Sequence, residues 1–377
     1  MNLVFGSPGR YVQGTEVLAQ AGAFLAHCGR KAVVVIDSYV LGLIRQRLDD
    51  TCAQSDVGLH YITFDGEITA DGIAGLRMAA AEVEFDMILA VGGGKCIDAG
   101  KALAHTSGRA LITMPTVASN DAPTSKNYVV YDAHHQLAEV GHLLVSPRYV
   151  LVDTTLIAQA PRQFLLAGIA DALTKKFEAE QCYKSGGVNM FGARPALSGL
   201  VLARECYHLI RQYAEPALAQ AGSGEVTVAF DHLVEAVLLM SGLGFESGGL
   251  SIAHAMTRGL SKIPGAQQQV HGFQVAYGLL VQLVLEDRNA ELMGDMLSFY
   301  QRIGLPRNLS ELGVSVIDHS VLMQVAEPTL KAPHARNFVS VSGGVLTCDE
   351  LIGAMRALEG LTLNTQSTSS LNAQPPR

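Results

Sequence analysis

Three residues beyond position 160 carry side chains that bind divalent metals. Asp171 lies in AGIADALTKKFEAE, His254 lies in GGLSIAHAMTRGL, and His271 begins HGFQVAYGLLVQLVLE. One carboxylate and two imidazoles on three helices would supply three oxygen or nitrogen ligands and leave a position open for a substrate. The chain has 12 histidines, and no two of the three residues are three or four positions apart. Spacing alone therefore leaves each histidine open to a surface or core role, although small neighbouring residues leave room for a ligand.

A glycine run in the first half could bind a phosphate group. Gly92, Gly93 and Gly94 follow an apolar segment and precede a helical pattern in VGGGKCIDAGKALAH. Backbone without Cβ atoms can approach a pyrophosphate, whose charge is met by free N–H groups and the helix dipole. The run matches neither G-x-x-x-x-G-K-[ST] nor G-x-G-x-x-G. Three glycines followed by Lys95 exceed what a tight turn needs, so we favour phosphate binding over a turn that binds nothing.

Two aspartates in the first half could hold polar groups of a ligand. Asp37 ends a strand-like run, where a carboxylate can accept hydrogen bonds from both hydroxyls of an adenosine ribose and repel a 2′-phosphate. That role would favour NAD over NADP, but Asp37 could equally cap the following helix. Asp121 lies in the loop from Pro115 to Asp132, so it could hold a polar substrate or stand in a solvated turn.

The elements that must position these residues are a parallel sheet and a set of helices. Short apolar runs alternate with helical patterns through the first 150 residues, which predicts a doubly wound α/β fold with ligands beyond the carboxyl ends of the strands. The expected strands are Lys31 to Asp37, Leu59 to Gly66, Asp86 to Gly94, Ala110 to Thr116 and Tyr149 to Asp153. After Pro161 the apolar residues recur at three- and four-residue spacing, which predicts an all-helical domain. We expect an α/β domain over 1–160, a helical domain over 161–360 and a polar tail over 361–377.

Composition narrows the classes of partner. The net charge is −8 and the sequence offers no basic stripe, so we expect no nucleic-acid partner. Only 16% of residues are charged, against about 25% in ordinary soluble proteins, which indicates a surface partly covered in a homo-oligomer. We identify neither a membrane span nor a signal peptide, so we expect a cytoplasmic protein without a membrane partner. Six cysteines without a C-x-x-C pair predict reduced thiols.

Taken together, these segments resemble the glycerol dehydrogenases of the metal-dependent (iron-containing) alcohol dehydrogenase superfamily. The resemblance is strongest in VGGGKCIDAGKALA, MPTVASNDAPTS, AGIADALTKKFEAEQCY and GLGFESGGLSIAHAMTRGL followed by VHGFQVAYG. It implies a Rossmann-like N-terminal domain that binds NAD, an all-α C-terminal domain that binds a metal, and assembly into octamers.

The same resemblance implies roles for individual residues. Asp171, His254 and His271 would bind Zn²⁺, with Fe²⁺ as the alternative metal, and Asp121 would contact a substrate hydroxyl. The residues that it assigns to the NAD site are Asp37, Gly93, Gly94, Lys95, Asp98, Thr116, Ser119, Ser125, Asn127 and Tyr131. The implied reaction is NAD-dependent oxidation of a small vicinal diol, or polyol, at a secondary hydroxyl, with glycerol to dihydroxyacetone as the reference. The metal would assist formation of the alkoxide.

Two departures from the family pattern bear on the substrate. The stretch from Ser125 to Tyr131 reads SKNYVVY where S-A-L-S-V-I-Y is usual, and HGFQVAYG stands where H-G-E-K-V-A-F-G is usual. Both changes put glycerol itself in question. Lys126 could attract an anionic substrate or face solvent, and we favour solvent because lysine is rarely buried unpaired.

Two other functions stay open. A dehydrogenase for a phosphorylated or carboxylated alcohol, or a dehydroquinate synthase-like lyase, would need several cationic side chains to hold anionic groups. Lys175, Lys176, Arg258 and Lys262 lie near the proposed ligands, but the first two adjoin on a helix and cannot both face one pocket. A non-catalytic NAD-binding protein would explain the glycines but gives no reason for Asp171, His254 and His271.

Overall fold

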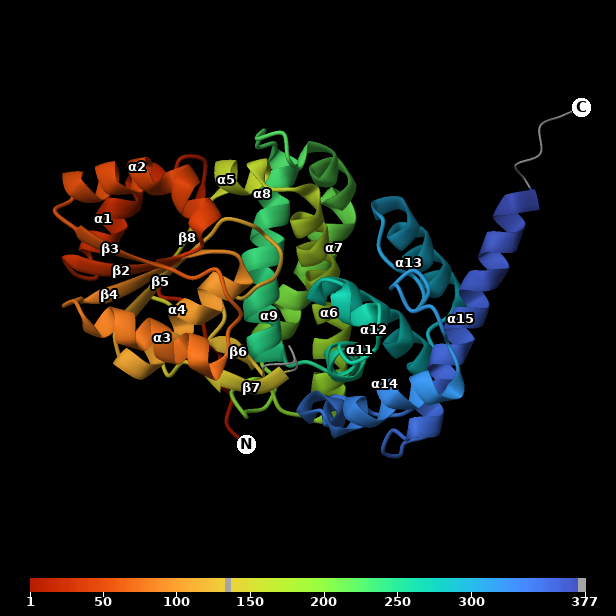
Figure 1. Cartoon of the computed structure of the whole chain (residues 1–377). Coiled ribbons are helices and arrows are strands. Elements are labelled where there is room, and N and C mark those ends of the chain that lie inside the picture. The colour runs from red at the N-terminus through yellow and green to blue at the C-terminus, as the bar shows by residue number, and fades with distance from the viewer. Residues whose placement is uncertain (133–136, 372–377) are drawn as a thin grey trace, which may run out of the picture.

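The computed structural model describes residues 1–132 and 137–371 of the chain. Its N-terminal part contains a six-stranded sheet in the order β1-β8-β5-β4-β2-β3, with every neighbouring pair parallel (Figure 1). The strands are β1 (Tyr11–Gly14), β2 (Lys31–Ile36), β3 (Gly58–Thr63), β4 (Met87–Gly92), β5 (Ala110–Pro115) and β8 (Tyr149–Asp153). All five strands expected from the sequence are present, and the doubly wound fold class is confirmed.

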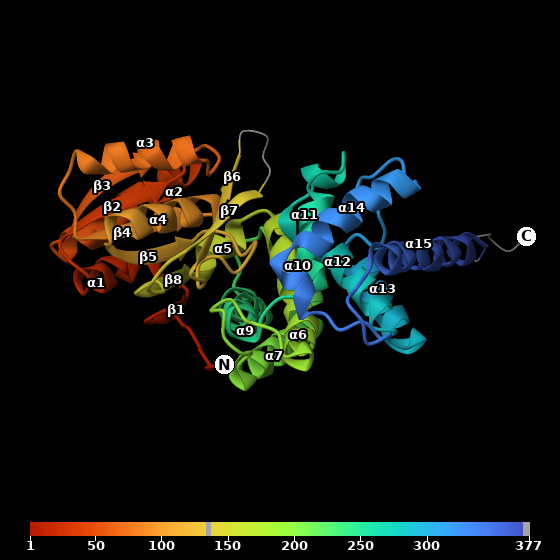
Figure 2. The same cartoon turned by 90° about the horizontal axis from the view of Figure 1, so that it is seen from below.

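Helices cover both faces of this sheet (Figure 2), which is why the central strands β2 and β4 are nearly continuous apolar runs. In β2, Val34 and Ile36 pack on one face with Ile44 and Leu48, while alternate residues such as Val33 pack on the other face. The helices of this part are η1 (Leu18–Gln20), α1 (Ala21–Ala26), α2 (Ser38–Gln54), α3 (Ala70–Ala81), α4 (Gly94–Ser107) and α5 (Thr154–Gln159).

Two features of this part were not expected. The edge strand β1 has only four residues, each half-buried, so its apolar signal is weak. An antiparallel hairpin pairs β6 (Asn127–Tyr131) with β7 (Leu137–His142), so the segment expected to be a loop from Pro115 to Asp132 in fact ends in a strand. The burial of β6 alternates along the strand, which is typical of a strand with one solvated face. Its sequence NYVVY is rich in aromatic and β-branched residues, so a local strand signal was present.

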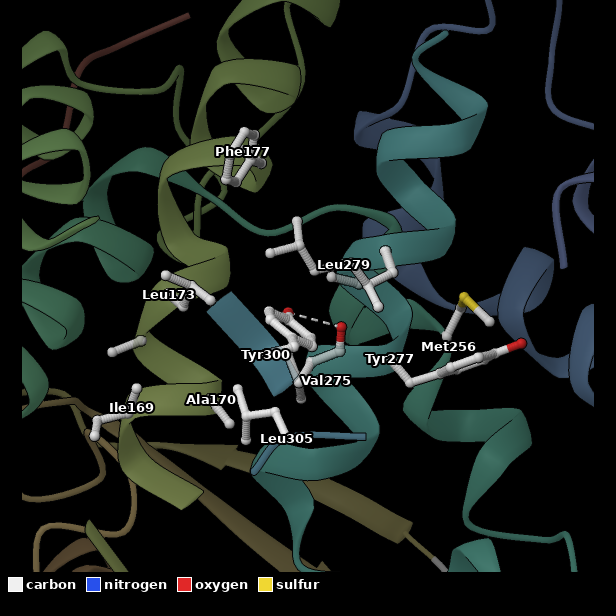
Figure 3. Packing of buried hydrophobic residues seen from close by; sticks show 14 of the residues in the cluster. Ile169, Ala170, Leu173, Phe177, Met256, Val275, Tyr277, Leu279, Tyr300 and Leu305 are labelled. Atoms are coloured by element: carbon white, nitrogen blue, oxygen red, sulfur yellow. Dashed lines mark hydrogen bonds between the residues drawn. The ribbon is translucent and has the colours of Figure 1, made fainter. Parts of the chain in front are cut away.

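Beyond β8 the described residues form helices, as the apolar spacing predicts. Figure 3 shows Ala170 and Leu173 of α6 and Val275 of α12 lying around the ring of Tyr300 in the largest apolar cluster. The helices are α6 (Arg162–Ser185), α7 (Leu197–Gln220), α8 (Val228–Glu235), η2 (Ala236–Met240, a π-helix), α9 (Ser241–Gly248), α10 (Ile252–Ala255), α11 (Thr257–Leu260), η3 (Ala266–Gln268), α12 (His271–Leu285), α13 (Ala290–Ile303), α14 (His319–Lys331), η4 (Pro333–Asn337) and α15 (Cys348–Leu371). The predicted boundary at residue 160 falls between α5 and α6.

One helical segment has the length and composition of a membrane span, although the sequence analysis identified none. The run from Val228 to Gly248, through α8, the π-helix and α9, is long and apolar enough to cross a membrane. More than half of its most apolar window is buried inside the protein, and α9 packs against α6 and α7. The core helix of a soluble protein has the same composition, so this segment is weak evidence for a membrane span.

The C-terminal segment is more ordered than its composition suggests. Helix α15 runs to Leu371, into the stretch from residue 361 that we expect to be a polar tail, and it projects away from the other helices (Figure 1). Its first turns are anchored by buried Leu351, Met355 and Leu358. Extending an anchored helix requires no new nucleation, which accounts for the continuation. Residues 372–377 lie outside the described residues.

Candidate active site

Asp171, His254 and His271 converge where α6, α10 and α12 meet. Their ligand atoms, one from each side chain, all lie within 4.8 Å of one another, and Oδ1 of Asp171 is 3.1 Å from Nε2 of His254. Asp171 is buried in the middle of α6, whereas His271 is the first residue of α12 and is exposed. Gly272 lets the start of α12 approach α6 closely. A Cβ at this position would lie 2.0 Å from the Ala167 carbonyl oxygen, so no other residue fits.

Glu178 orients His254. Its Oε2 lies 2.5 Å from Nδ1 of His254, and its Oε1 accepts from the backbone N–H groups of Ser251 and His254. Burial by itself raises the pKa of Glu178, but the neighbouring His254 outweighs it and lowers that pKa to about 2. An ionised carboxylate only accepts, so Nδ1 carries a proton. The Lys175 ammonium, which only donates, lies 3.0 Å from Nε2, so Nε2 presents its lone pair to that ammonium.

Lys175 lies in the middle of the same group. Its Nζ is 2.8 Å from Oδ1 of Asp171, 3.0 Å from Nε2 of His254 and 3.4 Å from Oδ2 of Asp121. Burial would raise the pKa of Asp171, but Lys175 and His254 hold it well below its usual value. Burial also lowers the pKa of Lys175, and the carboxylates of Asp121 and Asp171 outweigh that effect and raise it.

Asp121 reaches this group from the loop after β5. It is 7% exposed, and its Oδ2 accepts a 2.5 Å hydrogen bond from the hydroxyl of Ser241, the first residue of α9. Burial raises the pKa of Asp121, while Lys175 lowers it in part. The loop that we considered as a solvated turn thus carries a buried carboxylate beside the three candidate ligands.

The candidate dinucleotide residues gather at one edge of the sheet. The strands β2, β4 and β5 are adjacent and parallel, so Asp37, the glycine run and Thr116 all follow carboxyl ends at that edge. Gly92 has φ of +138°, a conformation that other residues rarely adopt, and Gly93 is the N-cap of α4 without a capping side chain. The first N–H groups of this 14-residue helix are therefore available to an anion.

Asp37 performs the capping role that we weighed against ribose binding. Its Oδ1 accepts a 2.8 Å hydrogen bond from the backbone N–H of Val40. Its Oδ2 faces the glycine turn, 3.2 Å from where a Cβ on Gly92 would stand. One oxygen caps the helix and the other points to the proposed dinucleotide edge, so the cap does not exclude the second role.

The other candidate NAD residues have partners within the protein. Lys95 forms an ion pair with Glu67, and Asp98 accepts from the N–H of Val129 and pairs with the fully buried Lys101. Thr116, Ser119 and Ser125 lie in the loop after β5; the first two are half-buried, and Ser125 accepts a hydrogen bond from Lys101. Asn127 and Tyr131 lie on β6. Asn127 contacts His142, and the N–H of the half-buried Tyr131 donates to the carbonyl of Ile68. Burial raises the pKa of both Asp98 and Tyr131.

Lys126 does not face solvent, so that expectation was wrong. It is 8% exposed, its Nζ lies 5.2 Å from the centre of the Phe191 ring, and it contacts Oδ1 of Asn127. Its backbone N–H donates to Oε1 of Glu246, whose Oε2 has no hydrogen-bond partner among the described residues. Burial raises the pKa of Glu246 to about 7.

Three polar side chains of the site were not identified from the sequence as functional: Glu178, Lys101 and Ser241. A signal for Glu178 was present, because Asp171, Lys175 and Glu178 stand at i, i+4 and i+7 and so share one face of an otherwise apolar helix. The sequence analysis named Lys175 among the cationic residues near the proposed ligands but did not predict its contact with Asp171 and His254. Lys101 and Ser241 carry no such local pattern, and only their contacts identify them.

Comparison with known proteins agrees with this arrangement. The family described as iron-containing alcohol dehydrogenase matches residues 8–154. A glycolaldehyde reductase of Halobacterium salinarum is 35% identical over 358 residues, covering 93% of this chain and 98% of the relative. A glycerol dehydrogenase of Escherichia coli is 37% identical over 314 residues, covering 83% of this chain and 86% of the relative.

Solved structures give the same result for the whole fold. The crystal structure of glycerol dehydrogenase from Schizosaccharomyces pombe superposes with a TM-score of 0.92 at 32% identity, covering 98% of this chain and 93% of that one. A probable glycerol dehydrogenase from Sinorhizobium meliloti superposes with a TM-score of 0.88 at 32% identity, covering 97% of this chain and 100% of that one.

Proposed function

Because the chain belongs to the iron-containing alcohol dehydrogenase family, we propose that it is an NAD-dependent, metal-containing dehydrogenase that oxidises a small vicinal diol at a secondary hydroxyl. Glycerol to dihydroxyacetone is the reference reaction. The observation that carries the proposal is the convergence of one carboxylate and two imidazoles within 4.8 Å, with Glu178 behind one of them. A non-catalytic NAD-binding protein has no need of this group.

The donor set fits a divalent metal. Oxygen from Asp171 and nitrogen from His254 and His271 are three protein ligands, the number typical of catalytic zinc sites, which keep one position for substrate. Glu178 supplies the carboxylate behind a histidine ligand that such sites commonly have. We propose Zn²⁺ as the metal, with Fe²⁺ as the alternative. Elemental analysis of protein purified under anaerobic conditions distinguishes the two metals.

The bound groups and the protein divide the chemistry between them. A divalent metal supplies a Lewis acid that stabilises negative charge on the substrate oxygen, and NAD supplies the acceptor for hydride. Asp121 holds a second hydroxyl of the diol through Oδ1, because its Oδ2 already accepts from Ser241. Packing of α9 and the loop after β5 around Asp121 keeps water from that carboxylate, which strengthens the hydrogen bond.

The cofactor lies at the sheet edge in this proposal. The N-terminus of α4 receives the pyrophosphate, and Asp37 receives the adenosine ribose through Oδ2. Asp98 and Lys101 act on the cofactor indirectly. Asp98 holds β6 by accepting from the N–H of Val129, and Lys101 holds Ser125 by donating to its hydroxyl. This division explains why Asp98, a member of the predicted NAD set, pairs with Lys101 and anchors β6.

A substrate comparison tests the proposal. Glycerol, 1,2-propanediol and 2,3-butanediol with NAD should give the highest kcat/KM, and glycolaldehyde with NADH tests the reaction named for the Halobacterium salinarum relative. Higher kcat/KM for 2-hydroxy acids or glycerol 1-phosphate would contradict the proposal and favour the anionic class. Absence of turnover with all of them, in protein loaded with metal, would favour the non-catalytic alternative.

We also propose that the protein is a cytoplasmic homo-oligomer, with the octamer as the expected form. Large apolar side chains stand exposed on one chain, among them Leu197 and Val201 on the outer face of α7 and Leu144 and Val145 after β7. Exposed apolar side chains of this kind commonly mark protein interfaces. Light scattering coupled to size-exclusion chromatography measures the mass directly, and a 40 kDa particle would contradict the proposal.

A further inference from the structure

Lys175 places an ammonium group among the atoms that the metal would need. Its side chain is fully buried and comes from the same face of α6 as Asp171, one turn further along. The distances of 2.8 Å to Oδ1 of Asp171 and 3.0 Å to Nε2 of His254 are both within hydrogen-bonding range. Its 3.4 Å separation from Oδ2 of Asp121 adds a third contact.

The contact with His254 matters most, because an imidazole nitrogen has a single lone pair in the ring plane. Nδ1–H donates to Glu178, and Lys175 is a donor beside the other nitrogen, so Nε2 is the acceptor. An ammonium has donors only, and Lys175 therefore donates to that lone pair. A metal ligated through Nε2 needs the same lone pair, so Lys175 and the metal cannot use it at the same time.

We propose that Lys175 is an internal competitor for the metal, occupying Nε2 of His254 and Oδ1 of Asp171 in the metal-free protein and yielding them when a metal binds. The inference rests on the proposed function in taking Asp171, His254 and His271 as the ligands. Without metal, the ammonium supplies the positive charge that two adjacent carboxylates, Asp171 and Asp121, require when buried. With metal, Lys175 keeps only its contact with Asp121.

Competition lowers the affinity for the metal in two ways. Binding must first break the charge-assisted hydrogen bonds of Lys175 to both ligands. The displaced ammonium then stays close to a divalent cation, held by Asp121, and like charges at short range repel. The benefit is a metal-free site whose carboxylates remain neutralised, so the fold does not depend on metal.

The test compares Lys175→Met with Lys176→Met in the full-length protein. Lys176 is the next residue of α6, but its Nζ lies over the rings of Phe177 and Tyr207 and contacts none of the ligands. The dissociation constant for Zn²⁺ is measured by competition with a chromophoric chelator after metal removal. Release of one charge-assisted hydrogen bond corresponds to about tenfold, so Lys175→Met should bind Zn²⁺ at least about tenfold more tightly, and Lys176→Met should match the unmodified protein.

A second variant covers the case in which Lys175→Met fails to fold without metal. Lys175→Met combined with Asp121→Asn removes one positive and one negative charge, so the net charge of the buried group is unchanged. The metal-free double variant should melt near the unmodified protein, whereas metal-free Lys175→Met should melt at lower temperature. Tighter Zn²⁺ binding by the double variant also excludes a simple effect of net charge.

The outcomes separate this inference from the proposed function. One Zn²⁺ per chain in the unmodified protein, lost in His271→Ala, tests the ligand set. Tighter binding by the double variant supports the competition, and tighter binding by Lys175→Met alone does not suffice. Equal or weaker binding by the double variant overturns it, even if the unmodified protein binds zinc as proposed.

Discussion

Oε2 of Glu178 lies 2.5 Å from Nδ1 of His254, and this contact decides which nitrogen of the ring faces Asp171. Glu178 is fully buried and also accepts from two backbone N–H groups, so its position does not depend on the ring. The lone pair of Nε2 is thereby aimed 3.1 Å from an oxygen of Asp171. Two electron-rich atoms at that separation repel each other unless a cation lies against both. The Lys175 ammonium does so here, and a divalent metal would use the same two atoms.

Replacing Glu178 should therefore weaken metal binding without touching a ligand. Glu178→Gln presents an amide donor where Nδ1 needs an acceptor, so it favours the tautomer with the proton on Nε2. Loss of such a partner typically costs about 10- to 100-fold in metal affinity. Zn²⁺ titration measures the change, with Glu180→Gln as the control, because Glu180 lies on the same helix and pairs with Arg204 rather than with His254. Equal affinities for the two variants would contradict the orienting role.

His271→Ala should abolish turnover and most of the metal content while leaving NAD binding nearly intact. The histidine lies on α12, whereas the glycine turn lies at the start of α4. A site with three protein ligands has no spare donor. Metal analysis and NAD titration by fluorescence measure the two effects, and His60→Ala on β3 serves as a histidine control. Normal metal content and rate in His271→Ala would refute the ligand assignment.

Asp37→Ser should shift the cofactor preference toward NADP. Serine keeps an oxygen that can accept from the N–H of Val40, so the cap of α2 survives, but it removes the charge that repels a 2′-phosphate. The quantity to compare is kcat/KM for NAD divided by kcat/KM for NADP. An unchanged ratio would leave Asp37 as a helix cap only.

Asp121→Asn tests the second hydroxyl of the substrate. A hydrogen bond to a charged acceptor contributes about 1.5–3 kcal/mol, so kcat/KM for glycerol should fall by about one to two orders of magnitude. A secondary alcohol with one hydroxyl, such as 2-propanol, should lose much less. Equal losses for both alcohols would mean that Asp121 acts through Lys175 and Ser241 rather than on the substrate.

Glu246 should make the protein less stable as pH rises. Burial raises its pKa to about 7 in the folded protein, above about 4.3 in the unfolded chain, so the folded state binds more protons between these values. Its contribution to stability is full below about pH 4.3 and is lost as pH rises through 7. The loss is about 4 kcal/mol at most, since the two pKa values differ by about 2.7 and each pKa unit corresponds to about 1.4 kcal/mol.

Glu246→Gln removes this titration and keeps an acceptor for the N–H of Lys126. Melting temperatures of the two proteins should diverge in favour of the variant between pH 5 and pH 8. Glu139→Gln, on the partly exposed hairpin strand β7, is the control. Parallel curves for Glu246→Gln and the unmodified protein would show that Glu246 is ionised throughout that range.

Much of the fold could be predicted because its signals are local. An apolar run such as Lys31–Ile36 or a three- and four-residue repeat such as that of α6 reports its own burial, and no distant residue is needed to interpret it. The hairpin of β6 and β7 was missed although β6 reads NYVVY, a local strand signal; its partner β7, LAEVGH, is mostly exposed or half-buried and gives a weaker pattern. Lys126 was misplaced because burial of a lysine depends on what packs over it, here Phe191 from a distant segment.

The sequence by itself determined the two-part fold class, the family, and the residue types available for metal and dinucleotide chemistry. Only the tertiary structure decided which of them meet. Asp171 and His254 are 83 positions apart, and their contact depends on how closely α12 and α10 pack on α6. The same packing buries Lys175 against both residues and places Glu178 behind His254. Helical spacing specifies the face on which a side chain lies, but the partner of that face is set by the packing of elements remote in sequence.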